Sequence, residues 1–209
     1  MKSHFYDLDS LRQEIEKFPD IYKIAFAASI CERMLPMYNK FSQIEKWGRP
    51  SLLREALDEV WLILQVKQID LPKIGQLIEE MDGENVLPDL NSEQFCDTNN
   101  YIFEAQFTVS AIYSTLTALL TSDFKYVMRV VKNARFETIE GFINQRDKLY
   151  EINNCEYEME LIANDPLAKQ ELAKEMEDLE KLKNAETLSP ELVEWLRTTS
   201  AGKSLIPLV

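Results

Sequence analysis

Two charged residues, Glu32 and Arg33, stand inside one of the most apolar stretches of the chain. Apolar side chains recur through residues 26–41 so densely that a helix here would be covered on most sides, as is typical of a helix at the centre of a domain. Buried charges are costly unless they are paired, so we expect partners close by. The residues predicted to meet in this polar cluster are Glu32, Arg33, Arg54, Asp58 and Trp61.

This predicted cluster has two interpretations. In the first, it is a satisfied ionic network that fixes two neighbouring helices, and Arg33 reaches Asp58 or Glu59. In the second, the same residues form the wall of a polar pocket beside Trp61. Replacement of Arg33 by Met separates them, because loss of stability indicates the network and loss of a ligand indicates the pocket.

A second chemistry is suggested by carboxylates three residues apart, Glu55 with Asp58 and Glu137 with Glu140. On a helix such pairs share a face and can present oxygen ligands to Mg²⁺. The alternative function is therefore a Mg²⁺-dependent enzyme that acts on a nucleotide or another phosphate through Glu55, Asp58 and Glu32, which requires three converging carboxylates. In a chain with 36 acidic residues such pairs also arise by coincidence. A solvated or ion-paired face is favoured, and no metal or cofactor is predicted.

Other catalytic arrangements are excluded by residue counts. The single histidine, His4, rules out histidine-based metal centres and Ser–His or Cys–His pairs. Residues 201–204 resemble the end of a phosphate-binding loop, but the position that needs a glycine is occupied by Arg197. Cys31 lies on a predicted packed face, where a thiol is inert. The sequence indicates no catalytic residue, and a non-enzymatic protein is favoured.

Charge and cysteine usage indicate the compartment and the kind of partner. The net charge of −13 repels nucleic-acid phosphates and suits a basic protein partner. The three cysteines are widely spaced without a C-x-x-C pair, which is typical of a reducing cytoplasm. Residues 105–122 carry no charge, but their many serines and threonines make them too polar for a membrane span. We expect a cytoplasmic protein that binds neither nucleic acid nor membrane.

The elements that must position these residues are predicted to be about seven helices, and no segment alternates as a strand. An antiparallel helix pair over residues 21–66, kinked by Pro36, is expected at the centre together with the uncharged helix near 105–121. A further helix is expected to begin at Asn91, and the apolar period slips near Phe136.

Two charged surfaces are also predicted. Lys125, Arg129, Lys132 and Arg135 share a helix flank, which acidic neighbours can neutralise. The run of Glu and Lys over residues 169–183 is expected to be a solvated face, and its apolar seam is a candidate contact with a second copy of the chain.

A resemblance to a known family is carried by Phe26, Cys31, Glu32, Arg33, Met34, Pro36, Tyr38, Phe41, Gly48, Arg54, Leu57, Asp58, Trp61, Val66 and Lys67. In these residues the chain resembles the YjaG-like family of bacterial proteins, an all-helical group catalogued as a domain of unknown function (DUF416). The similarity extends more faintly to about Lys183 and does not cover the segment after Asn184. Since the family has no established activity, the resemblance implies a fold and assigns no catalytic residue.

We therefore predict a single all-α domain over residues 1–209, with residues 190–209 as a peripheral C-terminal helix and tail. The favoured function is a non-enzymatic interaction or regulatory protein, with a homodimer as one arrangement. Its acidic surface suits a basic partner, such as a toxin or nuclease that it inhibits.

Overall fold

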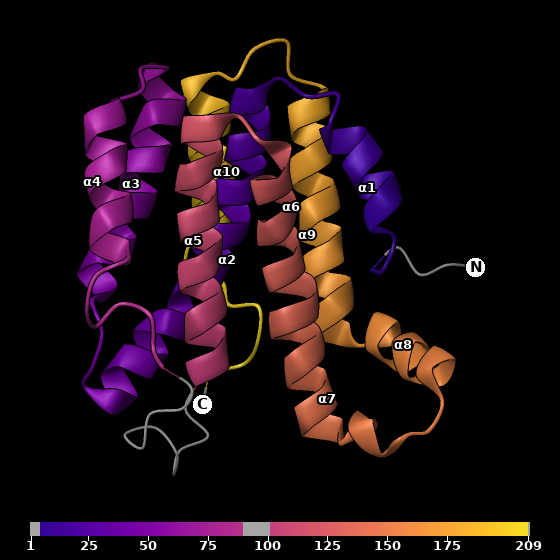
Figure 1. Cartoon of the computed structure of the whole chain (residues 1–209). Coiled ribbons are helices and arrows are strands. Elements are labelled where there is room, and N and C mark those ends of the chain that lie inside the picture. The colour runs from indigo at the N-terminus through magenta and orange to yellow at the C-terminus, as the bar shows by residue number, and fades with distance from the viewer. Residues whose placement is uncertain (1–4, 90–100, 209) are drawn as a thin grey trace.

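The computed structural model describes residues 5–89 and 101–208, and within these ranges every regular element is a helix (Figure 1). The helix predicted to begin at Asn91 lies outside the described residues. The elements, in chain order, are α1 (Leu8–Ile15), α2 (Asp20–Glu45), α3 (Pro50–Val66), α4 (Leu71–Met81), α5 (Ile102–Thr121), α6 (Phe124–Lys132), the π-helix η2 (Asn133–Glu140), α7 (Gly141–Asp147), the 3-10 helix η3 (Leu149–Glu151), α8 (Cys155–Asn164), α9 (Pro166–Lys183) and α10 (Pro190–Ser200).

The all-helical prediction is confirmed, but the number of helices was underestimated. In the part of the chain that the structure describes there are nine helices in a single compact domain, when α6, η2 and α7 are taken as one continuous rod and the three-residue η3 is not counted. The sequence did not show where this rod ends and α8 begins. Lys148, with a left-handed φ of 53°, ends the rod, and the side chain of Asn154 caps the first turn of α8.

Helix α2 lies at the centre of the domain because it is apolar on almost every side. It packs against α3, α5, α6, α9 and α10, and its most extensive contact is with the uncharged helix α5. Apart from a few residues at its ends, almost all of its side chains are buried. Although α5 is long, no helix in the described ranges is both long and apolar enough to cross a membrane.

Pro36 lies inside α2 without ending it. Its ring removes one backbone donor and crowds the preceding turn, which bends a helix rather than breaking it when both halves are packed. Figure 1 shows the C-terminal part of α2 running obliquely to its N-terminal part, toward the lower left. The bend brings the end of α2 next to the start of α3.

The connection from α2 to α3 is fixed by Tyr38. Its buried hydroxyl donates to the carbonyl oxygen of Val86 at 2.9 Å and accepts the backbone N–H of Arg49 at 3.1 Å. Gly48 has a left-handed φ of 96°, and a Cβ there would lie 2.7 Å from the Tyr38 hydroxyl oxygen. Only glycine fits this turn, for both its conformation and its close contact.

The slip in apolar period near Phe136 corresponds to the π-helical segment η2. A π-turn inserts an extra residue and so shifts which side chains face the core. This shift turns Arg135 inward, where it is 2% exposed. Arg135 therefore does not lie on a common flank with Lys125, Arg129 and Lys132. The expectation that an acidic helix neutralises it is confirmed, because it pairs with Glu175 of α9.

The C-terminal helices are more deeply packed than the sequence indicated. On α9 four charged residues of the run over 169–183 are buried, so the expected solvated face is in part an interior face; they are Glu171, Lys174, Glu175 and Asp178. Helix α10 packs against α2 and α3, and Val193 and Leu196 are fully buried. The segment expected to be peripheral thus contributes to the core.

Candidate functional site

Glu32 faces α3 and is held there by two side chains. Its carboxylate accepts hydrogen bonds from both terminal nitrogens of Arg54, at 2.9 and 2.8 Å, and from the indole N–H of Trp61 at 2.7 Å. Glu32 is buried, whereas Arg54 reaches from this contact to the surface. Burial opposes the charge on Arg54, but its bonds to Glu32 and its proximity to Asp58 outweigh this effect and raise the pKa of the guanidinium.

Asp58 links this group to the C-terminal helix. Its Oδ1 lies 2.9 Å from Nη2 of Arg54 and accepts a hydrogen bond from Nη2 of Arg197 on α10. Nε of Arg197 also lies 4.0 Å from Oε1 of Glu32. We call Glu32, Arg54, Asp58, Trp61 and Arg197 the Glu32 cluster; its two arginines and two acids balance one another.

Arg33 does not belong to the Glu32 cluster, and the expectation that it reaches Asp58 or Glu59 is wrong. Adjacent residues of an α-helix point about 100° apart, so when Glu32 faces α3 its neighbour faces another helix. Arg33 faces α9, where it makes two parallel bonds to Glu171, at 2.8 and 2.6 Å. The side chains predicted as one cluster therefore belong to two.

The second cluster, which we call the Arg33 network, is built around Arg33, Glu171 and Asp178. Nη1 of Arg33 lies 3.3 Å from Oδ2 of Asp178 and donates to Oγ of Ser200 on α10 at 3.0 Å. Asp178 also accepts a hydrogen bond of 2.9 Å from Ser29 Oγ, and its Oδ1 lies 2.5 Å from the Lys174 ammonium. Three helices, α2, α9 and α10, thus meet at one buried network.

A further buried ion pair, Arg135 with Glu175, joins the rod to α9. The Arg135 side chain contacts both carboxylate oxygens of Glu175 and donates to the carbonyl oxygen of Phe5 at 2.9 Å. Both side chains are almost completely buried, at 2% and 0% exposed. On α9 each buried acid therefore has a cation, which is the condition under which buried charges are tolerated.

The Arg33 network encloses no pocket large enough for a substrate. The cavity beside Arg33, which is also lined by Lys203 and Ser204, measures about 50 Å³, a space that holds one or two water molecules at roughly 30 Å³ each. Burial raises the pKa of the Glu171 carboxyl to about 7, although Arg33 acts against this shift. Burial likewise raises the pKa of the Cys31 thiol to about 12, which disfavours the reactive thiolate.

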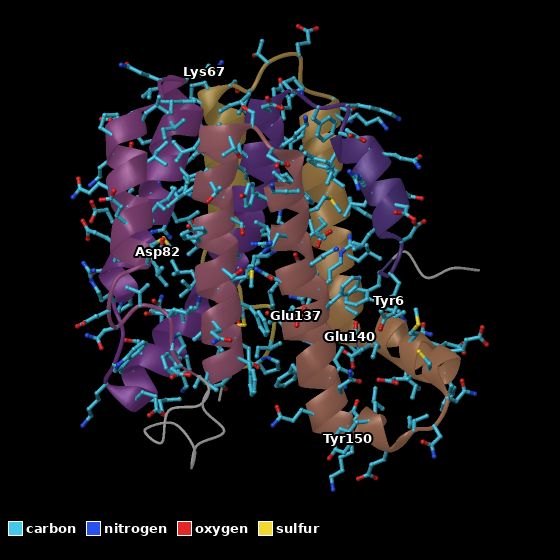
Figure 2. All side chains as sticks on the ribbon, in the orientation of Figure 1. Tyr6, Lys67, Asp82, Glu137, Glu140 and Tyr150 are labelled. Atoms are coloured by element: carbon cyan, nitrogen blue, oxygen red, sulfur yellow. The ribbon has the colours of Figure 1, made fainter. Side chains whose placement is uncertain are left out.

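The carboxylate pairs considered for Mg²⁺ do not converge. Glu55 pairs with Lys73, and Asp58 is bound by the arginines of the Glu32 cluster. Figure 2 shows Glu137 and Glu140 on the rod, in the opposite half of the molecule from α3, with Tyr6 near Glu140. Among residues 5–89 and 101–208 no group of three or more His, Cys, Asp or Glu side chains is arranged to hold a metal ion.

The Glu32 cluster opens onto a groove. Two adjoining hollows of about 530 and 600 Å³ lie on α3 and α10 and share Gln65; together we call them the α3–α10 groove. Arg54, Asp58 and Arg197 line it, while Glu32 and Trp61 are buried behind them. Its carboxylates are Glu55, Asp58, Glu59, Glu191 and Glu194.

Comparisons with known proteins identify the family. A family model described as "Protein of unknown function (DUF416)" matches residues 10–206. The chain belongs to the DUF416 family. The fold of this DUF416 protein is similar to the crystal structure of a DUF416 family protein from Shewanella baltica OS155, with a TM-score of 0.74 and 21% sequence identity over 90% of this chain and 91% of that one. No curated protein matches the chain significantly.

The DUF416 match includes the C-terminal segment that sequence reasoning left unassigned. Arg197 and Ser200, which complete the two clusters of this DUF416 protein, lie in that segment. For Glu171 and Asp178 the signal was present but misread. They stand seven residues apart, with Lys174 and Glu175 between them, and this spacing is typical of the inward stripe of a helix.

Proposed function

We propose that this chain is a non-enzymatic binding protein whose α3–α10 groove holds a basic segment of a partner protein. The observation that carries the proposal is the excess of acids in the groove, where five carboxylates accompany two arginines. Both arginines are engaged by Asp58, and Arg54 also by Glu32. Glu55 is paired with Lys73, so the acids that remain to attract a cation are Glu59, Glu191 and Glu194.

Three of these acids support the proposal individually. Glu59 and Glu194 form no ion pair within the part of the chain that the structure describes. Glu191 lies in the first turn of α10, where a hydrogen bond with Ser189 lowers its pKa and keeps it ionised. Unpaired surface carboxylates lining a hollow favour a partner of opposite charge.

A second copy of the chain in the groove and a Mg²⁺-dependent reaction both have less support. A second copy of this chain would bring another net charge of −13 to an acidic surface, which opposes association. A Mg²⁺-dependent reaction on a phosphate would need Glu55 and Asp58 as ligands, but cationic side chains already bind both. The partner that fits the groove is a basic protein, met in the cytoplasm that the cysteine pattern favours.

The test is binding of a fluorescent peptide of alternating Lys and Ala, followed by anisotropy. We expect binding to weaken as salt rises from about 0.01 to about 0.1 M, because the screening length falls from about 30 to about 10 Å. Replacing the three outer acids by Gln, as E59Q, E191Q and E194Q together, is expected to weaken binding about tenfold, since each exposed pair contributes up to about 1 kcal/mol.

The matched control removes the same charge elsewhere. The exposed acids Glu151, Glu156 and Glu160 lie outside the groove, and their joint replacement by Gln changes the net charge by the same amount. We expect this control to bind nearly as tightly as the original chain. Equal loss in both triple variants would show that total charge, and not the groove, attracts the peptide, and no binding at low salt would refute the proposed function.

A further inference from the structure

We infer that the segment bound in the α3–α10 groove is an amphipathic helix of about four turns, with an apolar stripe over Leu62 and basic residues on both flanks. This inference rests on the proposed function and adds the conformation and residue pattern of the partner segment. The groove has one wall on α3 and one on α10.

The groove contains an exposed apolar side chain, Leu62 of α3. This side chain lines the groove and is 49% exposed, and Val66, one turn further along α3, is 56% exposed. Ile69 and Leu71, which follow α3 in the sequence, are also exposed. Exposed apolar residues that lie next to one another mark interaction surfaces, whereas single ones need no explanation. The partner segment is therefore expected to carry apolar residues and not charge alone.

The flanking acids set the charge pattern of the partner. On the α3 wall Glu55 and Glu59 stand four residues apart, and on the α10 wall Glu191 and Glu194 stand three apart. Side chains at these spacings lie on one face of a helix. Glu55 is already paired with Lys73, so the carboxylates left for a partner are Glu59 on the α3 wall and Glu191 and Glu194 on the α10 wall. A complementary segment carries Lys or Arg on both flanks of its apolar stripe.

The backbone hydrogen bonds that the partner segment must make favour a helix over an extended strand. Both walls of the groove are helices, whose main-chain N–H and C=O groups are bonded within each helix. An extended segment lying between them would find no sheet edge, and its own backbone groups would be desolvated without partners. A helix satisfies these groups internally, and helix-in-groove binding through residues at i, i+3, i+4 and i+7 is a recurring mode of recognition.

The length follows from the lining residues of α3. They run from Ser51 to Gln65, a distance of about 21 Å at 1.5 Å per residue.

Trp195 lines the second hollow, and the ammonium groups of Lys174 and Lys181 lie 4.3 and 5.3 Å from the centre of its ring. These contacts with α9 hold the indole as a fixed wall of the groove.

The test compares three labelled peptides of about 18 residues, the length needed for four to five helical turns. The first has Leu at i, i+3, i+4 and i+7 with Lys on both flanks and Ala elsewhere. The second has the same composition in scrambled order, and the third has Ala in place of every Leu. We expect the first to bind at least tenfold more tightly than the other two and to gain helical circular dichroism on binding.

Two variants of the protein locate the apolar contact. Leu62→Gln is expected to weaken binding of the amphipathic peptide about tenfold, and to leave binding of the Leu-free peptide unchanged. Leu161→Gln, at an exposed leucine of α8 outside the groove, is the control and is expected to have no effect. Thermal melts of both variants establish that the fold is intact.

The outcomes distinguish failure of the amphipathic-helix inference from failure of the proposed function. Equal binding of all three peptides, or binding of the first without gain of helix, would overturn the amphipathic helix while the proposed function stands. A Leu62→Gln variant that binds the amphipathic peptide as tightly as the original chain would do the same. If none of the peptides binds at low salt, the proposed function itself fails.

Discussion

Glu32 and Arg33 are neighbours in the sequence but serve different parts of the molecule. Glu32 bonds Arg54 and Trp61 of α3, while Arg33 bonds Glu171 of α9. Each charge is buried with a counter-charge, so neither is available to a substrate. At the scale of single residues this favours the ionic network over the pocket for Arg33, because its surroundings are closed.

Arg33 is predicted to be necessary for the stability of the Arg33 network. Replacing it by Met leaves Glu171 and Asp178 buried with one fewer cation, and we expect a loss of about 3–5 kcal/mol in the free energy of unfolding. The double variant R33M/E171L removes one charge of each sign and is expected to recover part of this loss. Urea denaturation measures both, and an Arg33→Met variant as stable as the original chain would contradict the network.

At the scale of elements, α10 closes both clusters at once. It supplies Arg197 to Asp58 and Ser200 to Arg33, and its outward-facing residues line the groove. Val193 and Leu196 anchor it in the core. The same short helix therefore covers the buried charges and forms one wall of the candidate binding site.

This role predicts that α10 is essential for stability. Leu196→Ala removes a fully buried side chain and is expected to cost about 2–5 kcal/mol. The control Leu161→Ala, at a partly exposed position on α8, is expected to change stability by less than about 0.5 kcal/mol. Chemical denaturation of both variants provides the comparison. Equal small effects would mean that α10 is a peripheral helix after all.

Across the whole molecule, the buried charges and the surface charges are distributed differently. Inside, acids and bases balance within each cluster, whereas the surface carries the excess that gives the net charge of −13. The buried carboxyl of Glu171 couples the interior to pH, since its pKa is raised from 4.5 to about 7. Surface carboxyls such as Asp123 and Asp147 have lowered pKa values, because Lys125 and Arg146 hydrogen-bond to them.

The pH dependence of stability follows from these directions. Between pH 4.5 and about 7 the native Glu171 holds a proton that the unfolded chain has released, so its contribution to the unfolding free energy falls as pH rises. The contribution levels off about one pH unit above 7, once the native carboxyl is also ionised. E171Q removes this contribution. We expect the stability difference between E171Q and the original chain to change over about pH 5–8 and to level off above, by up to about 1.4 kcal/mol per pH unit. Urea denaturation from about pH 5 to about pH 9 measures it, and a difference independent of pH would refute the assignment.

The class of structure and the centre of the fold could be predicted from the pattern of apolar residues. Dense apolar residues over 26–41 predicted the buried helix α2, and the uncharged run near 105–121 predicted its main partner α5, because burial of apolar surface depends on composition and period alone. The sequence also indicated that Glu32, Arg54, Asp58 and Trp61 belong to one polar cluster, although the spacing of the two helices placed Arg33, and not Glu32, beside Asp58.

The positions of the remaining charges depend on how the helices pack in three dimensions. Glu171, Lys174 and Asp178 read as a solvated helix face, since charged residues are seldom buried without partners and the partners are distant in the sequence. Arg33 and Ser29 lie more than a hundred residues away from these acids and meet them only because α9 packs on α2. Local sequence sets which faces are apolar. The pairing of buried charges, by contrast, depends on which helices become neighbours, and that is a property of the whole chain.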